Sequence, residues 1–410
     1  MTFFTDVDYK RMNELASEKL KISKECKSDL SNLLATIKEK ILINDDTLLS
    51  IISAINAGFN IILYGPPGTA KSTLSEILPK VIWNAKCNIH TADSDWSVKK
   101  VIGGLNISYE INGDDCKEII EPKDGYLVSD IYECYSSLIG TKDHDTVFSI
   151  IDEFNRTNMD ECLGPLFTAM GSDNKSLKLD YNIGYKGKPL HITIPASYRI
   201  ICNMNKYDRT FTNDLSEALT RRFKWIYIGS PSQSDYDREK KLIKDRVFNN
   251  VLPSSLKSAD ILIPLPDYKN TPFFDTYVAE PILNIITEIR KELDIGTSYG
   301  IDAIKIAYHF YNLKFQLLDF YKINGFSVQS LENSNKIDDF ITTLTNTSQI
   351  ESFREKIDIL LRSTIDSSIT MTIAPLFDAI EDSSKLEIIK ELLKDYPLCL
   401  AEISRINLLC

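Results

Sequence analysis

A stretch from Gly65 to Ser72, reading GPPGTAKS, has the residue types and spacing of a phosphate-binding loop. It matches the pattern G-x-x-x-x-G-K-[ST], except that Ala70 stands at the second glycine. In such a loop the backbone N–H groups and the N-terminus of the next helix form a concave anion site. Lys71 would contact the β- and γ-phosphates of a nucleotide, and the Ser72 hydroxyl would ligate Mg²⁺. The residues expected to bind the nucleotide are Gly65, Pro66, Pro67, Gly68, Thr69, Ala70, Lys71, Ser72 and Thr73.

Two adjacent carboxylates, Asp152 and Glu153, form the second candidate feature, about 80 residues beyond the loop. They end the apolar run 148–151, which is typical of a buried strand. Asp152 would hold Mg²⁺ through water, and Glu153 would act as general base on the attacking water. The alternative is a helix N-cap with solvated carboxylates. The position of the pair beyond a phosphate loop favours the catalytic interpretation.

A parallel sheet is needed to bring these two features together. Short apolar runs at 60–64, 146–151, 198–203 and 224–228 predict buried strands. Helical patterns follow the first two runs, from Ser72 and from the residues after Glu153. Strands that alternate with helices predict an α/β fold with a parallel sheet.

Two hairpins are expected beside this sheet. Residues 106–122 alternate about Asn112-Gly113, and residues 177–195 carry Gly184 and Gly187 near a turn. The first hairpin is acidic. The second, with its approach, is locally basic because it holds Lys175, Lys178, Lys186 and Lys188 against Asp173 and Asp180. Each is either a functional insertion or a solvated surface hairpin.

The character of the chain changes after Pro231. Helical periodicity predicts helices at 233–249, 282–293, 301–322, 349–366 and 385–394. Residues 250–281 hold five prolines and little periodicity, so we expect a loop there. The expected organisation is a helical lead at 1–45, a nucleotide-binding α/β core at 46–229, and a helical lid with further helices at 230–410.

Composition narrows the class of protein. The net charge of −11 over 410 residues argues against a protein that coats nucleic acid. No apolar stretch is long and uninterrupted enough to span a membrane, and the N-terminus lacks the basic n-region of a signal peptide. The eight cysteines form no CxxC pair, so we expect neither a disulfide framework nor a zinc site. Reduced thiols favour the cytoplasm.

Beyond the acidic pair, the sequence resembles a known family. Phe154-Asn155-Arg156-Thr157-Asn158 resembles the DE-x-NR-x block shared by McrB-like and MoxR-like AAA+ ATPases. Residues 204–209, MNKYDR, and 218–223, ALTRRF, are similar to the MN-x-x-DR and AL-x-RRF blocks of the McrB group. Asp95-Trp96-Ser97, Ile102-Gly103-Gly104 and 164–167 also resemble this group. The resemblance covers residues 45–230 well and 231–410 only loosely, as a helical lid.

The resemblance implies roles for three more residues and a ring assembly. Asn205 would be sensor 1, which orients the hydrolytic water or the γ-phosphate. Arg221 and Arg222 would be arginine fingers that act on the nucleotide of a neighbouring subunit in a hexamer. The alternative for this pair is a helix C-terminus in which the cations face the dipole. No basic residue occurs at 296–302, where relatives carry the sensor 2 arginine. ATP is the expected substrate, with GTP as the alternative because 205–208 spells NKxD.

Hydrolysis of a nucleoside triphosphate is therefore the expected chemistry, and three uses of it remain open. The leading hypothesis is the motor subunit of a McrBC-like anti-phage restriction system, which pulls DNA through its pore and activates a partner nuclease. No nuclease motif and no long N-terminal extension are visible, so specificity would belong to a partner. The other hypotheses are a MoxR-like chaperone and a nucleotide-gated scaffold. An acidic exterior is compatible with a DNA motor if the lysines of the second hairpin line the pore.

Overall fold

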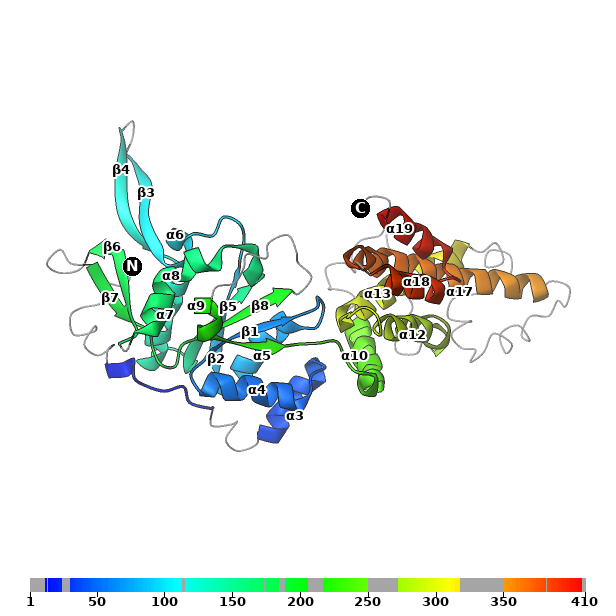
Figure 1. Ribbon diagram of the computed structural model, residues 1–410, viewed down its shortest axis with the longest axis horizontal. Helices are drawn as coiled ribbons and strands as arrows, with labels where there is room; N and C mark the ends of the chain where they lie inside the picture. Colours follow the sequence, from blue (N-terminus) through cyan, green and yellow to red (C-terminus); the bar gives the residue numbers. More distant parts are fainter. Residues whose placement is uncertain are drawn as a thin grey trace. The chain divides into compact units, whose positions relative to one another are not determined.

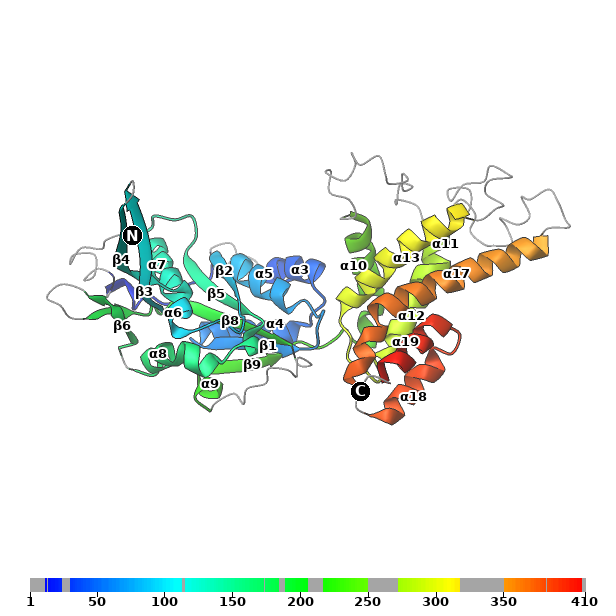
Figure 2. The same cartoon turned by 90° about the horizontal axis from the view of Figure 1, so that it is seen from above.

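The chain forms two compact units, Met1–Ile228 and Gly229–Cys410, in a computed structural model. The residues that the structure describes are 12, 14–23, 30–112, 115–172, 174–183, 189–205, 217–249, 272–317, 350–380 and 382–407. Strands occur in the first unit, and the described part of the second unit is helical (Figures 1 and 2).

A five-stranded sheet forms the centre of the first unit, in the order β2-β5-β8-β1-β9. All neighbouring strands are parallel, which confirms the predicted α/β fold. The strands are β1 (Asn60–Gly65), β2 (Ala85–Thr91), β5 (Thr146–Asp152), β8 (Arg199–Asn205) and β9 (Phe223–Tyr227). The sequence did not reveal β2, which lies at the edge of the sheet and alternates between polar and apolar residues.

Helices cover both faces of this sheet because the strands are apolar on both sides. Ile61 and Leu63 of β1 pack in one cluster with α3, α4 and α5, whereas Ile62 packs in the cluster of α7 and α8. The helices are α3 (Leu30–Lys40), α4 (Asp45–Asn56), α5 (Lys71–Trp83), α6 (Val98–Val101), α7 (Tyr126–Leu138), α8 (Met159–Gly171) and α9 (Glu217–Arg222). Two of them begin at asparagine N-caps, Asn44 for α4 and Asn158 for α8.

Both predicted hairpins are present in the first unit. One joins β3 (Gly103–Asn112) to β4 (Asp115–Asp124), and the other joins β6 (Ser176–Ile183) to β7 (Pro189–Thr193). The two turns lie outside the described residues. Tyr181 fastens the hairpins together, since its hydroxyl donates to the Ile102 carbonyl at 3.0 Å and to an Asp124 carboxylate oxygen at 2.9 Å. Within the described part of the second hairpin, Lys178 pairs with Asp180 at 2.5 Å. Lys186 and Lys188 lie outside the described residues, so the predicted basic character of this hairpin stays a prediction.

The second unit packs its helices around one continuous apolar core. Its helices are α10 (Tyr236–Asn249), α11 (Pro272–Phe274), a π-helical turn (Asp275–Ala279), α12 (Glu280–Ile289), α13 (Thr297–Leu317), α17 (Ile350–Thr372), α18 (Ser383–Leu392) and α19 (Pro397–Asn407). Two 3₁₀ turns, Gln233–Asp235 and Ala374–Ala379, complete the set. None of the described helices is both long and apolar enough to cross a bilayer.

The predicted loop at 250–281 is wrong for its last ten residues, 272–281, which are helical. Phe273 and Phe274 are fully buried in the core of the second unit and anchor this helix. The prolines that suggested a loop are tolerated because Pro272 begins α11 and Pro281 lies in the first turn of α12. Residues 250–271 lie outside the described part of the chain.

Candidate nucleotide site

The phosphate-binding loop lies between the end of β1 and the start of α5. Its backbone needs residues without a bulky Cβ, because a Cβ on Gly65 would lie 2.1 Å from the Ile228 carbonyl oxygen. Gly68 has a φ of 77° and Ala70 a φ of 63°, both left-handed. Alanine is thus held in the conformation that glycine adopts freely. The Thr69 hydroxyl closes the turn by donating to the Pro66 carbonyl at 3.0 Å.

Lys71 is the buried cation of this loop, with 6% of its surface exposed. Its ammonium folds back and donates to the carbonyl oxygens of Gly65 at 3.1 Å and Pro66 at 2.6 Å. Both acceptors are neutral. Because hydrogen bonds between ionised groups are stronger than those to neutral carbonyls, a phosphate can displace these contacts. Lys71 can therefore exchange these two carbonyl contacts for the oxygens of a bound phosphate.

Ser72 and Asp152 meet across the top of the sheet. The Ser72 hydroxyl, in the first turn of α5, donates to the two carboxylate oxygens of Asp152 at 3.1 and 3.0 Å. Mg²⁺ at phosphate sites takes one or two protein oxygen ligands and completes its shell with phosphate and water. A hydroxyl and a carboxylate at this separation fit that requirement. No cluster of three or more His, Cys, Asp or Glu side chains suited to a metal occurs among the described residues.

Glu153 stands beside this pair in a strained backbone conformation, with φ 54° and ψ 40°. Its carboxylate accepts from the Asn205 side-chain amide at 3.3 and 3.4 Å. It also pairs with Arg156, Nε to Oε2, at 3.2 Å. Asn205 reaches this place because β8 pairs with β1 in a register that sets Asn205 opposite Gly65. The sheet therefore brings together the ends of three strands that the sequence predicted as site elements.

The two arginines at the end of α9 have different surroundings. The Arg222 side chain donates through Nε to the Phe167 carbonyl at 2.8 Å, and its guanidinium lies 5.7 Å from the centre of the Phe167 ring. Arg222 therefore joins α9 to α8. Arg221 is exposed. Arg222 therefore has a structural contact with α8, whereas the finger role and the helix C-terminal alternative both stay predictions for this pair.

Comparisons with known proteins agree with this geometry. A family model described as "AAA domain (dynein-related subfamily)" matches residues 60–223. The chain is 27% identical over 196 residues to the "Type IV methyl-directed restriction enzyme EcoKMcrB subunit" of Escherichia coli (strain K12). The alignment covers 46% of this chain and 39% of that relative, so the chain spans about two fifths of the relative's length. Residues 60–223 form a McrB-like AAA+ domain.

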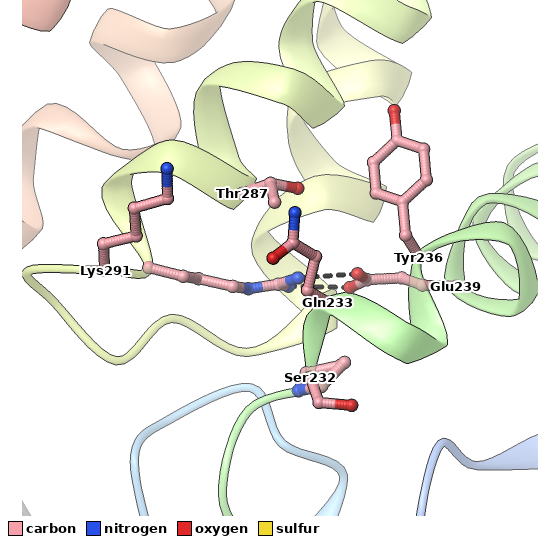
Figure 3. Close-up of a pocket in the computed structure, with 8 residues that line it drawn as sticks. Ser232, Gln233, Tyr236, Glu239, Thr287 and Lys291 are labelled. Carbon is pink, nitrogen blue, oxygen red and sulfur yellow. Dashed lines mark hydrogen bonds and ion pairs between the residues drawn. The ribbon is translucent and has the colours of Figure 1, made fainter.

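Residues 296–302, where the resemblance places sensor 2, hold no basic residue. In sequence, Arg290 is the arginine nearest before the segment 296–302. Its guanidinium bonds both carboxylate oxygens of Glu239 at 2.6 and 2.7 Å (Figure 3). Its Nε also donates to the Ile295 carbonyl at 2.9 Å. A pocket of about 180 Å³ lies against this pair, between Gln233, Tyr236 and Thr287. Glu239 pairs with Arg290, and Lys291, which also lines the pocket, pairs with Glu288 at 2.6 Å. Both cations of the pocket therefore already have a carboxylate partner.

The structure describes only part of the blocks that carry the resemblance. Residues 206–209, which complete the MN-x-x-DR block and the NKxD match, lie outside the described residues. The contact of Arg156 with the Glu153 carboxylate was not predicted, although Arg156 occupies the NR block of the resemblance. The signal was its spacing of three residues from Glu153, which brings the side chains together across a single 3₁₀ turn.

Proposed function

We propose that this chain is a ring-forming nucleoside triphosphatase that hydrolyses ATP, with GTP as the alternative, in the presence of Mg²⁺. The observation that carries the proposal is the contact between Ser72 and Asp152, with Glu153 next to it. Such a constellation provides a metal-ligand pair and a base at the end of a strand, in front of a phosphate-binding loop. The AAA+ domain type supports nucleotide binding at this place.

Each residue of the nucleotide site has a separate role in the proposed hydrolysis. The loop from Gly65 to Thr73 binds the phosphates, and Lys71 exchanges its carbonyl contacts for the β- and γ-phosphates. Ser72 would hold Mg²⁺ directly and Asp152 would hold it through water, and the bound ion would neutralise charge on the phosphate oxygens. Glu153 accepts the proton of the attacking water once its contact with Arg156 loosens, while Asn205 holds its position. Arg221 serves the neighbouring subunit's site in a hexamer, and Arg222 supports it from the same helix end.

The proposed biological role is the motor subunit of a McrBC-like anti-phage restriction system in the cytoplasm. The similar E. coli protein is described as a restriction enzyme subunit, which supports this role. In this proposal the ring translocates DNA through its pore and drives a partner nuclease. Lys175 and the lysines of the second hairpin are the candidate pore contacts, although Lys178 is paired with Asp180. DNA capture would then rest mainly with the partner.

A MoxR-like chaperone is the second candidate function, and one observation favours it. Leu105, Ile107 and Ile120 are 53%, 53% and 61% exposed, and the register of β3 and β4 sets Ile107 opposite Ile120 on one face. Exposed apolar side chains gathered on one face are typical of surfaces that bind protein. This face is also compatible with a protein effector of a restriction system.

A panel of nucleotides, assayed with and without DNA, tests these proposals. The motor role predicts Mg²⁺-dependent hydrolysis of ATP or GTP that DNA or a nuclease partner stimulates. Stimulation by an unfolded or partner protein, with no response to DNA or nuclease, would favour the chaperone. A chain that hydrolyses neither nucleotide at any Mg²⁺ concentration would contradict both.

Mixed rings test the role of Arg221. Subunits with Arg221→Ala keep their own Glu153 but lack the finger, whereas Glu153→Gln subunits keep the finger and lack the base. Mixing the two inactive variants should restore part of the turnover, because some interfaces then combine an intact base with an intact finger. Arg222→Lys is the matched control for the neighbouring cation. If no mixture regains activity, a finger that acts between subunits is excluded.

A further inference from the structure

One buried polar side chain lies directly beneath the candidate nucleotide site. Asn203 of β8 is 2% exposed and stands opposite Leu63 of β1. Residues two apart in a strand share a face, so Asn203 lies on the same face as Asn205, one layer deeper in the sheet. The side chains of Leu63 and Ile201 around it belong to the apolar cluster beneath α5. An amide is therefore placed in an otherwise aliphatic layer.

A chain of hydrogen bonds connects this amide to the metal-binding pair. The Asn203 amide nitrogen donates to the Ser75 hydroxyl at 3.0 Å, and the Ser75 hydroxyl donates to the Ser72 carbonyl at 2.8 Å. The Ser72 hydroxyl in turn donates to Asp152 at 3.0 and 3.1 Å. We call Asn203, Ser75 and Ser72 the Asn203 relay. It joins the middle of β8 to the first turn of α5.

The relay is costly for folding. The Asn203 side-chain oxygen is buried and has no hydrogen-bond donor among the described residues. A buried amide that is satisfied on one side only is less stable than an apolar side chain of similar shape. Ser75, 1% exposed, likewise places a hydroxyl where an aliphatic group would pack. Buried groups of this kind call for an explanation other than stability.

We propose that Asn203 is a positioning residue that acts through Ser75 to set the place of Ser72 against Asp152. This inference rests on the proposed function, because it assigns the relay to the Mg²⁺-nucleotide site. The amide restrains the first turn of α5 relative to β8, and so fixes the separation between the hydroxyl and the carboxylate that receive the metal. Outer-shell partners of this kind change metal affinity by about 10- to 100-fold when they are removed.

The test compares Mg²⁺ dependence of nucleotide binding with stability in the full chain. Binding of the fluorescent analogues mant-ATP and mant-GTP is titrated in EDTA and at increasing Mg²⁺ for the wild type, Asn203→Leu, Ser75→Ala and the double variant. We expect near wild-type affinity in EDTA. The Mg²⁺ concentration for half-maximal enhancement should rise about tenfold in each single variant. The midpoint of thermal unfolding of Asn203→Leu should not fall.

The double variant and a control give the inference its specificity. Because both residues act in one chain of contacts, the double variant should shift the Mg²⁺ requirement no further than the larger single shift. Cys202→Ala changes a buried residue of the same strand on the opposite face, and it should leave the requirement unchanged. If Asn203→Leu does not fold, the Mg²⁺ requirement of Ser75→Ala alone tests the relay.

Two outcomes would overturn the relay. One is a wild-type Mg²⁺ requirement in both single variants, and the other is a double variant whose shift is the product of the two single shifts. A wild-type chain that binds neither analogue would instead contradict the proposed function, and the role of the relay with it.

Discussion

Buried charges occur in both units of the molecule, but their partners differ. In the first unit, the buried Lys71 donates to two neutral carbonyls, and the half-buried Glu153 contacts Arg156 and Asn205 at 3.2 to 3.4 Å. In the second unit, Arg290 and Glu239 form a two-pronged ion pair at 2.6 and 2.7 Å. A ligand displaces neutral or long contacts more readily than a short bidentate ion pair, because the bidentate pair is stronger. The first arrangement suits chemistry and the second suits stability.

The backbone shows the same contrast. Ala70 and Glu153 hold left-handed conformations beside the candidate site. Among the described residues of the second unit, none outside glycine has a positive φ. Strained backbone persists where the surrounding structure enforces it, and it concentrates at functional sites. The comparison therefore predicts that changes in the first unit alter turnover, and that changes in the second unit alter stability.

The sequence offers a direct way to measure the two units separately. All three tryptophans, Trp83, Trp96 and Trp225, belong to the first unit. Tryptophan fluorescence therefore follows unfolding of the first unit, while far-ultraviolet circular dichroism also reports the helices of the second. Both signals, measured together with the rate of nucleotide hydrolysis, separate effects on the first unit from effects on the second.

Glu153→Gln should have the largest effect, a loss of about 10²- to 10⁴-fold in turnover. The amide keeps the shape of the side chain but cannot accept the proton of the attacking water. Nucleotide binding and both unfolding transitions should stay near wild type, since the carboxylate is only partly buried. Steady-state hydrolysis and mant-nucleotide titration measure the two quantities. Retained turnover would remove Glu153 from the role of general base.

Arg290→Met should cost about 3–5 kcal/mol of unfolding free energy in the second unit. The change leaves the Glu239 carboxylate buried, with 4% of its side chain exposed and no cation beside it. Denaturant titration followed by circular dichroism measures the loss. Turnover measured well below the unfolding midpoint should stay within a factor of two.

The matched control for this ion pair removes both charges. Arg290→Met with Glu239→Leu should recover most of the lost stability, because two packed apolar side chains replace a buried pair at little net cost. A double variant as unstable as the single one would show that the guanidinium contact with the Ile295 carbonyl matters more than the pair.

The two units also differ in how much of their structure could be predicted from the sequence. The site residues of the first unit follow strands or a glycine-rich loop, and parallel strands end at one edge of a sheet. Local sequence patterns were therefore enough to predict that these site side chains lie close together. The strand β2 was missed because Lys86, Asn88 and His90 make it polar on one side. Asn88 and His90 bond the buried Asp130 of α7, a tertiary contact that no local pattern reveals.

The second unit depends more on contacts between residues distant in sequence. Helix α19 was not predicted, and its N-terminus is capped by Asp366 from α17, more than thirty residues earlier. The prolines after residue 271 predict a loop, whereas residues 272–281 are helical. The two buried phenylalanines of this segment decide the structure through packing. Composition alone reveals neither the Asp366 cap of α19 nor the packing of the two phenylalanines.

Asp366→Ala should destabilise the second unit by about 2 kcal/mol. The buried carboxylate accepts from the backbone N–H groups of Leu398 and Cys399, both at 2.9 Å, and alanine leaves both groups without this acceptor. Denaturant titration followed by circular dichroism measures the change. An unchanged midpoint would mean that α19 docks through its apolar face alone.

The exposed cap Asp382 of α18 is the matched control for Asp366. Asp382→Ala should have a smaller effect, since solvent replaces the lost acceptor. Hydrogen bonds from Ser384 lower the pKa of Asp382 below its ordinary value. A carboxylate with a lowered folded-state pKa stabilises the protein above the unfolded pKa, and this contribution is lost as pH falls through the folded pKa. The difference between wild type and Asp382→Ala should therefore shrink in acid.

Ala70→Gly should have the smallest effect, and its sign is informative. The left-handed conformation costs an alanine about 1 kcal/mol, which glycine avoids. Glycine gains more entropy in the unfolded chain, which offsets part of this advantage. The first unit should gain roughly 0.5 kcal/mol by tryptophan fluorescence. Ala54→Gly, in the interior of α4, is the matched control and should lose about 1 kcal/mol because its backbone is helical. Losses in both variants would mean that Ala70 contributes through its methyl contacts, and that the loop is not strained at this residue.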